Sequence, residues 1–253
     1  MTKLNKILPH GNIEKIFENI WYVKGQVKMP MLLPMKISKT MTIIKNPLNN
    51  ELTLLNAMPL NLEGLKQLES IGKITNTLRI GGYHGRDDNF YKEKFNTKAY
   101  ALKGQVYAKK FEKAVEHPDN GYFKADVIIE NESDLPFDNA SLKFFETSHP
   151  PEAILKLNQD GGILFTADSL QNTAKPDEFC NFFARKMMGK MGFFKAYNVG
   201  PGWVQFAKPS LEEIRSILDL EFESLVPGHG DAVIGNAKEK YRPTLEGEIK
   251  GCH

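Results

Sequence analysis

The chain has 253 residues, of which 41% are hydrophobic and 25% are charged, and its formal net charge is +2. These values are ordinary for a globular protein, and they exclude disordered, collagen-like and coiled-coil chains. A charge balance this close to neutral gives no reason to expect a nucleic-acid or membrane partner. The sequence has no internal repeat, low-complexity tract or Gly/Ser linker, so we expect one domain over residues 1–253.

The expected compartment follows from the cysteines and the N-terminal residues. Cys180 and Cys252 are too few for a disulfide framework, which favours a reducing environment. The first residues are basic but lack the apolar stretch of a signal peptide, and no run approaches the roughly 18 apolar residues of a membrane span. We therefore expect a soluble, cytoplasmic protein.

The first third of the chain has the pattern of strands, because short apolar or β-branched runs alternate with turn residues. These runs are Ile20–Val23, Met31–Leu33, Met41–Ile44 and Leu52–Leu55. A helix is predicted over Leu62–Ile71, where leucines recur on one face. Asn61 can cap the start of this helix, and Gly72 can end it.

Further along the chain, strands and helices alternate. The alternation of apolar and polar residues over Ile74–Ile80 predicts a half-buried strand that leads into Gly81–His84. A helix at Phe90–Phe95 and a strand at Ala99–Ala101 are expected next. The second half has five further predicted strands: Ala125–Ile129, Leu142–Phe145, Ala153–Leu157, Ile163–Thr166 and Phe222–Val226.

Three helices are predicted between and after these strands. One carries Phe179, Phe182, Phe183 and Met187 on a single face, a second begins at the capping box Ser210–Glu213, and a third reaches about Leu245. The apolar stretch Met187–Phe194 is interpreted first as core, with a lid over the site or a dimer patch as alternatives. This order of elements predicts two mixed β–α halves whose sheets pack together, with helices outside.

Candidate functional residues lie at the ends of predicted strands, where rigid folds place reactive groups. They are His84, Asp88, His149, Asp168 and His229. Neutral imidazoles and carboxylates together form a site suited to zinc, iron or manganese. Each residue alone has an ordinary structural role, such as a helix cap or a turn, so the prediction depends on their order and spacing.

Four segments in chain order carry these residues: His84-Gly-Arg-Asp-Asp-Asn89, Thr147-Ser-His149-Pro, Ile163-Leu-Phe-Thr-Ala-Asp168 and Pro227-Gly-His229-Gly. Together they resemble the motifs of the metallo-β-lactamase superfamily, over about Gly11 to Leu245. The resemblance implies an α+β fold, a four-layer αββα sandwich of two mixed sheets with helices on the outer faces. It also implies a metal-dependent hydrolase whose site lies at the sheet edges between the two halves.

The first metal position departs from the family pattern. The resemblance implies that this metal would be held by His84, by the residue at position 86 and by His149, with Asp168 shared. Position 86 is Arg86, whose guanidinium keeps its proton at neutral pH and cannot ligate a cation. We expect no tightly held metal there.

The second metal position keeps more of its implied ligands, which are Asp88, the residue at position 89 and His229, with Asp168 shared. Position 89 is Asn89, which offers only a weak, neutral oxygen. Asp88, Asp168 and His229 remain as a three-ligand set with room for water. We therefore predict a mononuclear site with one divalent ion, zinc first and iron or manganese as alternatives.

A metal-bound water would supply hydroxide near neutral pH, oriented by Asp88 or Asp168. Arg86 or Tyr83 would stabilise charge on the substrate oxygen. The expected reaction is hydrolysis of an ester, thioester, lactone or phosphodiester in a small molecule, which can be anionic. The sequence names neither that substrate nor the oligomeric state.

Two alternatives stay open. In the first, Arg86 pairs with Asp88 or Asp168, and a metal-poor cleft binds a small anionic ligand through Arg86 without catalysis. In the second, the same pocket holds iron and performs redox chemistry, because histidine and carboxylate ligands also suit iron.

Overall fold

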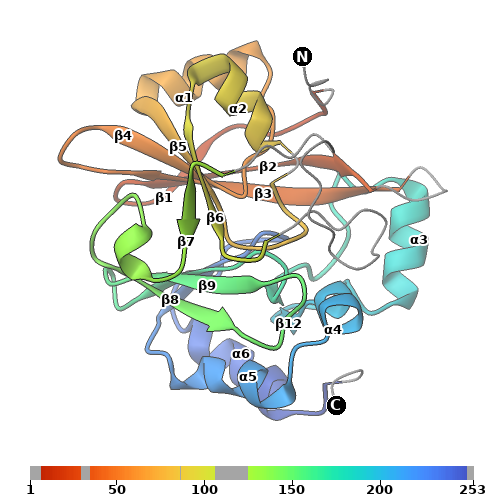
Figure 1. Cartoon of the computed structure of the whole chain (residues 1–253). Coiled ribbons are helices and arrows are strands. Elements are labelled where there is room, and N and C mark those ends of the chain that lie inside the picture. The colour runs from red at the N-terminus through yellow and green to blue at the C-terminus, as the bar shows by residue number, and fades with distance from the viewer. Residues whose placement is uncertain (1–6, 30–34, 86, 106–124, 250–253) are drawn as a thin grey trace.

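The structure, a computed structural model, describes residues 7–29, 35–85, 87–105 and 125–249. The predicted strand Met31–Leu33 lies outside the described residues. Figure 1 shows four layers. They are the helices α1 (Leu62–Ile71) and α2 (Asp88–Phe95), a large sheet, a smaller sheet, and the helices α5 (Leu211–Arg215) and α6 (Ala237–Glu246). This arrangement is the predicted α+β sandwich with helices on both outer faces.

The large sheet has seven strands, which follow one another across the sheet in chain order. They are β1 (Glu14–Phe17), β2 (Ile20–Lys28), β3 (Lys36–Lys45), β4 (Glu51–Leu55), β5 (Lys73–Arg79), β6 (Lys98–Leu102) and β7 (Val127–Ile129). The strands β1 to β4 are antiparallel, whereas β4 to β7 are parallel. Parallel neighbours need a crossover, and α1 (Leu62–Ile71) and α2 (Asp88–Phe95) supply the first two.

The smaller sheet has four strands in the order β13-β10-β9-β8. They are β8 (Ala140–Phe145), β9 (Glu152–Leu157), β10 (Ile163–Phe165) and β13 (Ser224–Val226). A separate short pair joins β11 (Leu170–Gln171) to β12 (Asn198–Val199). The remaining helices are η2 (Glu132–Asp134), α3 (Phe182–Lys190), α4 (Pro201–Ala207), α5 (Leu211–Arg215), η3 (Ser216–Asp219) and α6 (Ala237–Glu246).

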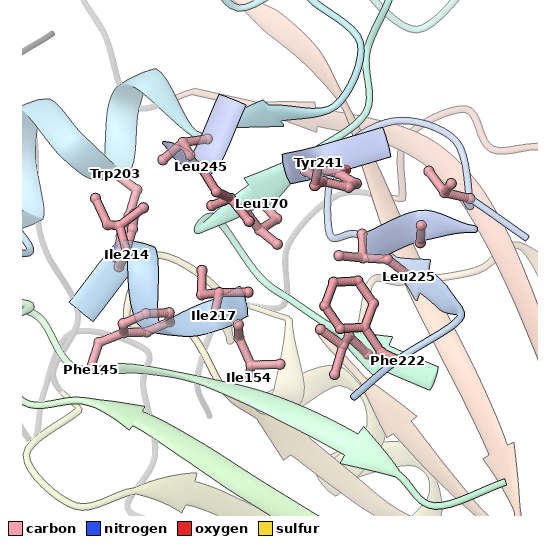
Figure 2. Close-up of a cluster of buried hydrophobic side chains, with 14 of the residues drawn as sticks. Phe145, Ile154, Leu170, Trp203, Ile214, Ile217, Phe222, Leu225, Tyr241 and Leu245 are labelled. Atoms are coloured by element: carbon pink, nitrogen blue, oxygen red, sulfur yellow. The ribbon is translucent and has the colours of Figure 1, made fainter. Parts of the chain in front are cut away.

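Three apolar clusters hold the layers together. One joins α1 and α2 to the outer face of the large sheet, and a second fills the space between the two sheets. The third lies between the smaller sheet and the helices α4 to α6, where Figure 2 shows Ile154, Trp203, Ile217 and Tyr241 among its side chains. Burial of these apolar side chains from water is the main favourable contribution to folding.

The predicted elements are largely confirmed, with differences that burial explains. The strand predicted at Ile74–Ile80 is β5, but the prediction that it is half-buried is wrong, because Thr77 and Arg79 are buried too. Helices cover one face of this sheet and the second sheet covers the other, so neither face of β5 meets water. The short elements β1, β11, β12 and α4 were not predicted.

The core interpretation of Met187–Phe194 is also wrong. Met187 and Met191 are 37% and 41% exposed, and Ala184 is the one buried residue of α3. The stretch instead lines a pocket that is described below. Within the described part of the chain, no helix is long and apolar enough to cross a membrane.

The cap predicted for α1 is present, because the Asn61 side chain accepts a hydrogen bond of 2.8 Å from the backbone N–H of Gly64. We expect Asn61→Ala to lower the free energy of unfolding by about 1 kcal/mol, since one N–H of the first turn loses its partner. Chemical denaturation of both proteins would measure this difference. Asn158→Ala, at an exposed position outside any helix, is the control, and an equal loss there would contradict a specific capping effect.

Candidate metal centre

Three loops bring the central residues of the site together. Asp168 and His229 follow β10 and β13, which are parallel neighbours, so the two loops leave the smaller sheet at the same edge. His84 follows β5 of the large sheet. A β-bridge between Gly81 and Glu152 ties the His84 loop to the smaller sheet. The site therefore lies where the edges of the two sheets meet.

The two imidazoles flank one carboxylate. His84 Nε2 lies 3.3 Å from Asp168 Oδ2, and His229 Nε2 lies 3.2 Å from Asp168 Oδ1. The ring centroids of the two histidines are 5.3 Å apart. One ligand atom from each residue lies within 4.8 Å of the other two, so this group can hold a metal ion.

The tautomer of His229 is set by its backbone partner. Its Nδ1 lies 2.8 Å from the carbonyl oxygen of Ser38, and a carbonyl can only accept a hydrogen bond. The neutral ring therefore carries its proton on Nδ1 and presents a lone pair at Nε2. That lone pair faces an oxygen of Asp168, and two acceptors at 3.2 Å repel unless a proton or a cation lies between them. A backbone carbonyl that orients a histidine in this way is typical of metal ligands.

The charge states of the other two residues also suit a cation. Burial lowers the pKa of His84 to about 4, against the opposing effect of Asp168, so this ring is neutral at neutral pH. Burial alone would raise the pKa of Asp168, but the two imidazoles, when either shares a proton with the carboxylate, hold it well below its usual range. Neutral histidine and ionised carboxylate are the forms that bind metal.

A buried glutamate supports the Asp168 loop. Glu152 begins β9, is 1% exposed, and its Oε1 accepts hydrogen bonds from the backbone N–H groups of Asp168 (3.0 Å) and Ser169 (2.6 Å). Burial and the nearby charge of Asp168 raise the pKa of Glu152. Sequence analysis missed this residue, although a glutamate at the start of the apolar run of β9 was a signal that it has a specific partner.

Glycines press against the same loop from two other segments. A Cβ at Gly200 would overlap with the carbonyl oxygen of Asp168, and a Cβ at Gly228 would overlap with that of Ala167. Only glycine permits an approach this close. The backbone of the Asp168 loop is thus in close contact with Gly200 and Gly228, and it is also hydrogen-bonded to Glu152.

The structure does not bring Asp88 and Asn89 into the group. Both begin α2 and are buried there, and the Asn89 amide donates a hydrogen bond of 3.1 Å to Glu93. Burial raises the pKa of Asp88 to about 6, although Arg79 and Lys39 oppose that rise. The three residues that meet are therefore His84, Asp168 and His229, so His84 takes the place predicted for Asp88 in the three-ligand set.

The other predicted residues have different settings. His149 is exposed, and its backbone N–H donates to Ala207 at 2.9 Å. Its imidazole is not part of the described group. Arg86 lies outside the described residues. Tyr83 is half-buried beside the site, and burial, with the charges of Asp168 and Glu152, raises the pKa of its hydroxyl, which stays protonated and able to donate.

Lys39 is a second residue that sequence analysis missed. It is 4% exposed, its Nζ donates to the carbonyl of Ala57 at 2.7 Å, and it lies 3.9 Å from Asp87 Oδ2. Its signal was visible in β3, where Lys39 takes a position on the alternating apolar face of Ile37 and Met41. Lys39, Tyr83 and the His–Asp–His group all line one pocket of about 200 Å³.

Comparison with known proteins places the fold. No family model matches the sequence, and no curated protein matches it. Solved structures of metallo-β-lactamases do match. The enzyme from Hirschia baltica has 10% identity and a TM-score of 0.55, over 96% of this chain and 100% of that one.

Two further structures agree with this match. FIM-1 from Pseudomonas aeruginosa, solved in its mono-zinc form, has 11% identity and a TM-score of 0.56, over 96% of this chain and 97% of its own. The enzyme from Erythrobacter litoralis has 12% identity and a TM-score of 0.57, over 95% of this chain and 99% of its own. The chain has the metallo-β-lactamase fold, in a divergent form, and the predicted αββα architecture is confirmed.

Proposed function

We propose that this protein is a metal-dependent hydrolase that holds one divalent ion, zinc first, on His84, Asp168 and His229. The observation that carries the proposal is the lone pair of His229 Nε2 directed at an ionised carboxylate, an arrangement that needs a cation or a proton between the two groups. The likeness to FIM-1, which was solved in a mono-zinc form, supports zinc as the ion.

The residues present fit such an ion. Two imidazole nitrogens and one carboxylate oxygen are ligands that zinc takes in catalytic sites, where three protein ligands leave a position open for water or substrate. When bound there, the ion would lower the pKa of a water molecule and supply hydroxide near neutral pH.

The chain's own groups would position the reaction. Asp168 stays ionised and can hold the hydrogen of the attacking water. The Tyr83 hydroxyl keeps its proton and can donate to the substrate oxygen on which negative charge develops. Lys39 adds a positive charge to the wall of the same pocket. These roles suit hydrolysis of an ester, thioester, lactone or phosphodiester.

The test is the metal content of protein purified without chelator or metal-affinity resin, followed by assays of p-nitrophenyl acetate and bis(p-nitrophenyl) phosphate. We expect about one ion per chain, and cleavage of one substrate that a chelator abolishes and zinc restores. Two ions per chain would refute the mononuclear site. Protein that stays metal-free after soaking with zinc, iron or manganese would refute the hydrolase and favour an anion-binding protein.

A further inference from the structure

The pocket at the candidate metal centre is unusually rich in methionine. Among the described residues, five methionines line it: Met29, Met35, Met187, Met188 and Met191. Three of them come from α3 and the residue after it, Met29 follows the end of β2, and Met35 precedes the start of β3. Because these segments lie far apart in the sequence, the fold itself gathers the methionines beside His84, Asp168 and His229.

Aromatic side chains also contribute apolar surface to the lining of this pocket. Phe193, Phe194 and Phe206 line the pocket with Trp203, whose indole N–H is already bonded to Ser148 at 3.0 Å. These side chains offer a ligand apolar contact rather than hydrogen bonds. The polar lining includes the groups around the candidate metal centre, Lys39 and Tyr83 among them, and also Lys28, Gln171 and Thr173.

The helix α3 packs on the large sheet through Ala184 and Met188, in a small apolar cluster with Met35 and Ile37, but most of its other side chains are exposed. Ala184 is its one buried residue, and Met187 and Met191 keep 37% and 41% of their surface exposed. Apolar side chains left open in a pocket commonly mark a ligand site. Methionine side chains are unbranched, flexible and polarizable, so a wall made of them adapts to a flexible apolar chain.

We infer that the substrate is an acyl compound, an ester, thioester or lactone, whose acyl group carries an unbranched alkyl chain. The chain would lie against the methionines while the carbonyl reaches the His84–Asp168–His229 group. This inference rests on the proposed hydrolase function and narrows it, since it excludes phosphodiesters and short-chain acyl groups as the preferred substrates.

The reaction balances with water as the only co-reactant. The water oxygen bonds to the acyl carbon, and the bond from that carbon to the alcohol oxygen or thiol sulfur breaks. That oxygen or sulfur takes one proton of the water, and it leaves as the alcohol or thiol or, for a lactone, stays in the same molecule as a hydroxyl group. The second proton is released as the carboxylic acid ionises. The alkyl chain is unchanged, so its contacts with the pocket act through binding alone.

The first test compares p-nitrophenyl esters of acetate, butyrate, octanoate and decanoate with the zinc-loaded protein, and repeats the series with acyl thioesters. We expect kcat/KM to rise about fourfold for each methylene that enters the pocket, until the chain outgrows it. The ester and thioester series separate the two leaving groups. A flat or falling dependence on chain length in both series would overturn the inference.

A binding measurement separates this inference from the proposed function. Titration calorimetry of decanoate and acetate needs no catalysis and can be done with Asp168→Asn as well as the natural protein. Decanoate binding without any hydrolysis would refute the hydrolase and retain the alkyl-chain pocket. Hydrolysis of acetate and decanoate esters at equal rates, with no decanoate binding, would refute the pocket and retain the hydrolase.

Two substitutions on α3 form a matched pair. Met187→Gln keeps the length of the side chain but places an amide in the pocket, and we expect the decanoate-to-acetate ratio of kcat/KM to fall at least about fivefold. Phe182 is on the same helix and 72% exposed, but it does not line the pocket, so Phe182→Gln should leave the ratio unchanged. An equal effect of both substitutions would contradict the proposed contact.

Discussion

Asp168→Asn should lower the affinity for the metal more than about 100-fold and abolish metal-dependent hydrolysis, with little change in the thermal stability of the metal-free protein. The amide keeps the shape of the side chain but removes the negative charge that faces both imidazoles. Loss of a supporting residue around a metal site costs about 10- to 100-fold in affinity, so loss of a direct ligand should cost more. Elemental analysis and a thermal melt of the purified variant would measure both effects.

The control for Asp168→Asn is Asp219→Asn, which changes an exposed aspartate of η3 that is not part of the candidate metal centre. It should keep the metal and the activity. If Asp168→Asn retained one ion per chain, the ligand set proposed here would be wrong. Asp88→Asn and His149→Ala would then test the residues that the family resemblance implies.

Glu152→Ala should have the second large effect, because it damages both the fold and the metal site. The backbone N–H groups of Asp168 and Ser169 lose their acceptor in a buried position. A buried donor without a partner costs about 1–3 kcal/mol, so we expect unfolding to become easier by a few kcal/mol. The loop that carries Asp168 would also loosen, with roughly 10- to 100-fold weaker metal binding.

Glu152→Gln tests whether the stability and the metal affinity depend on the charge of the carboxyl group or only on the hydrogen bonds that it accepts. Its amide oxygen can accept the same two hydrogen bonds, so stability and metal affinity should stay close to those of the natural protein. Denaturation curves and zinc titrations of both variants would decide the matter. If Gln were as damaging as Ala, the carboxyl group would have a role beyond supporting the loop.

The sequence predicted most of the fold because the apolar runs and caps are local signals. The helix at Leu62–Ile71 appears with its predicted cap at Asn61. His84, Asp168 and His229 could be named because each follows a strand, and a strand end is readable from the chain alone. The structure then showed that these three, and not Asp88, are the residues that meet.

What could not be predicted depends on contacts between distant segments. Glu152 and Lys39 matter through partners that lie 16 and 18 residues away or more. The apolar stretch Met187–Phe194 was assigned to the core because its composition is that of a core. Only the fold reveals that α3 leaves these side chains open to a pocket.

The glycines around the Asp168 loop limit which substitutions this protein can accept near its candidate metal centre. Gly200 and Gly228 touch the backbone of that loop so closely that any larger residue would displace it. Substitution of either glycine is therefore expected to displace the Asp168 loop at this end of the pocket. Met187 and Met191 of the pocket wall are exposed and flexible, so they can be exchanged one at a time with little effect on packing. The range of ligands can thus change through these two side chains while the His84–Asp168–His229 group stays in place.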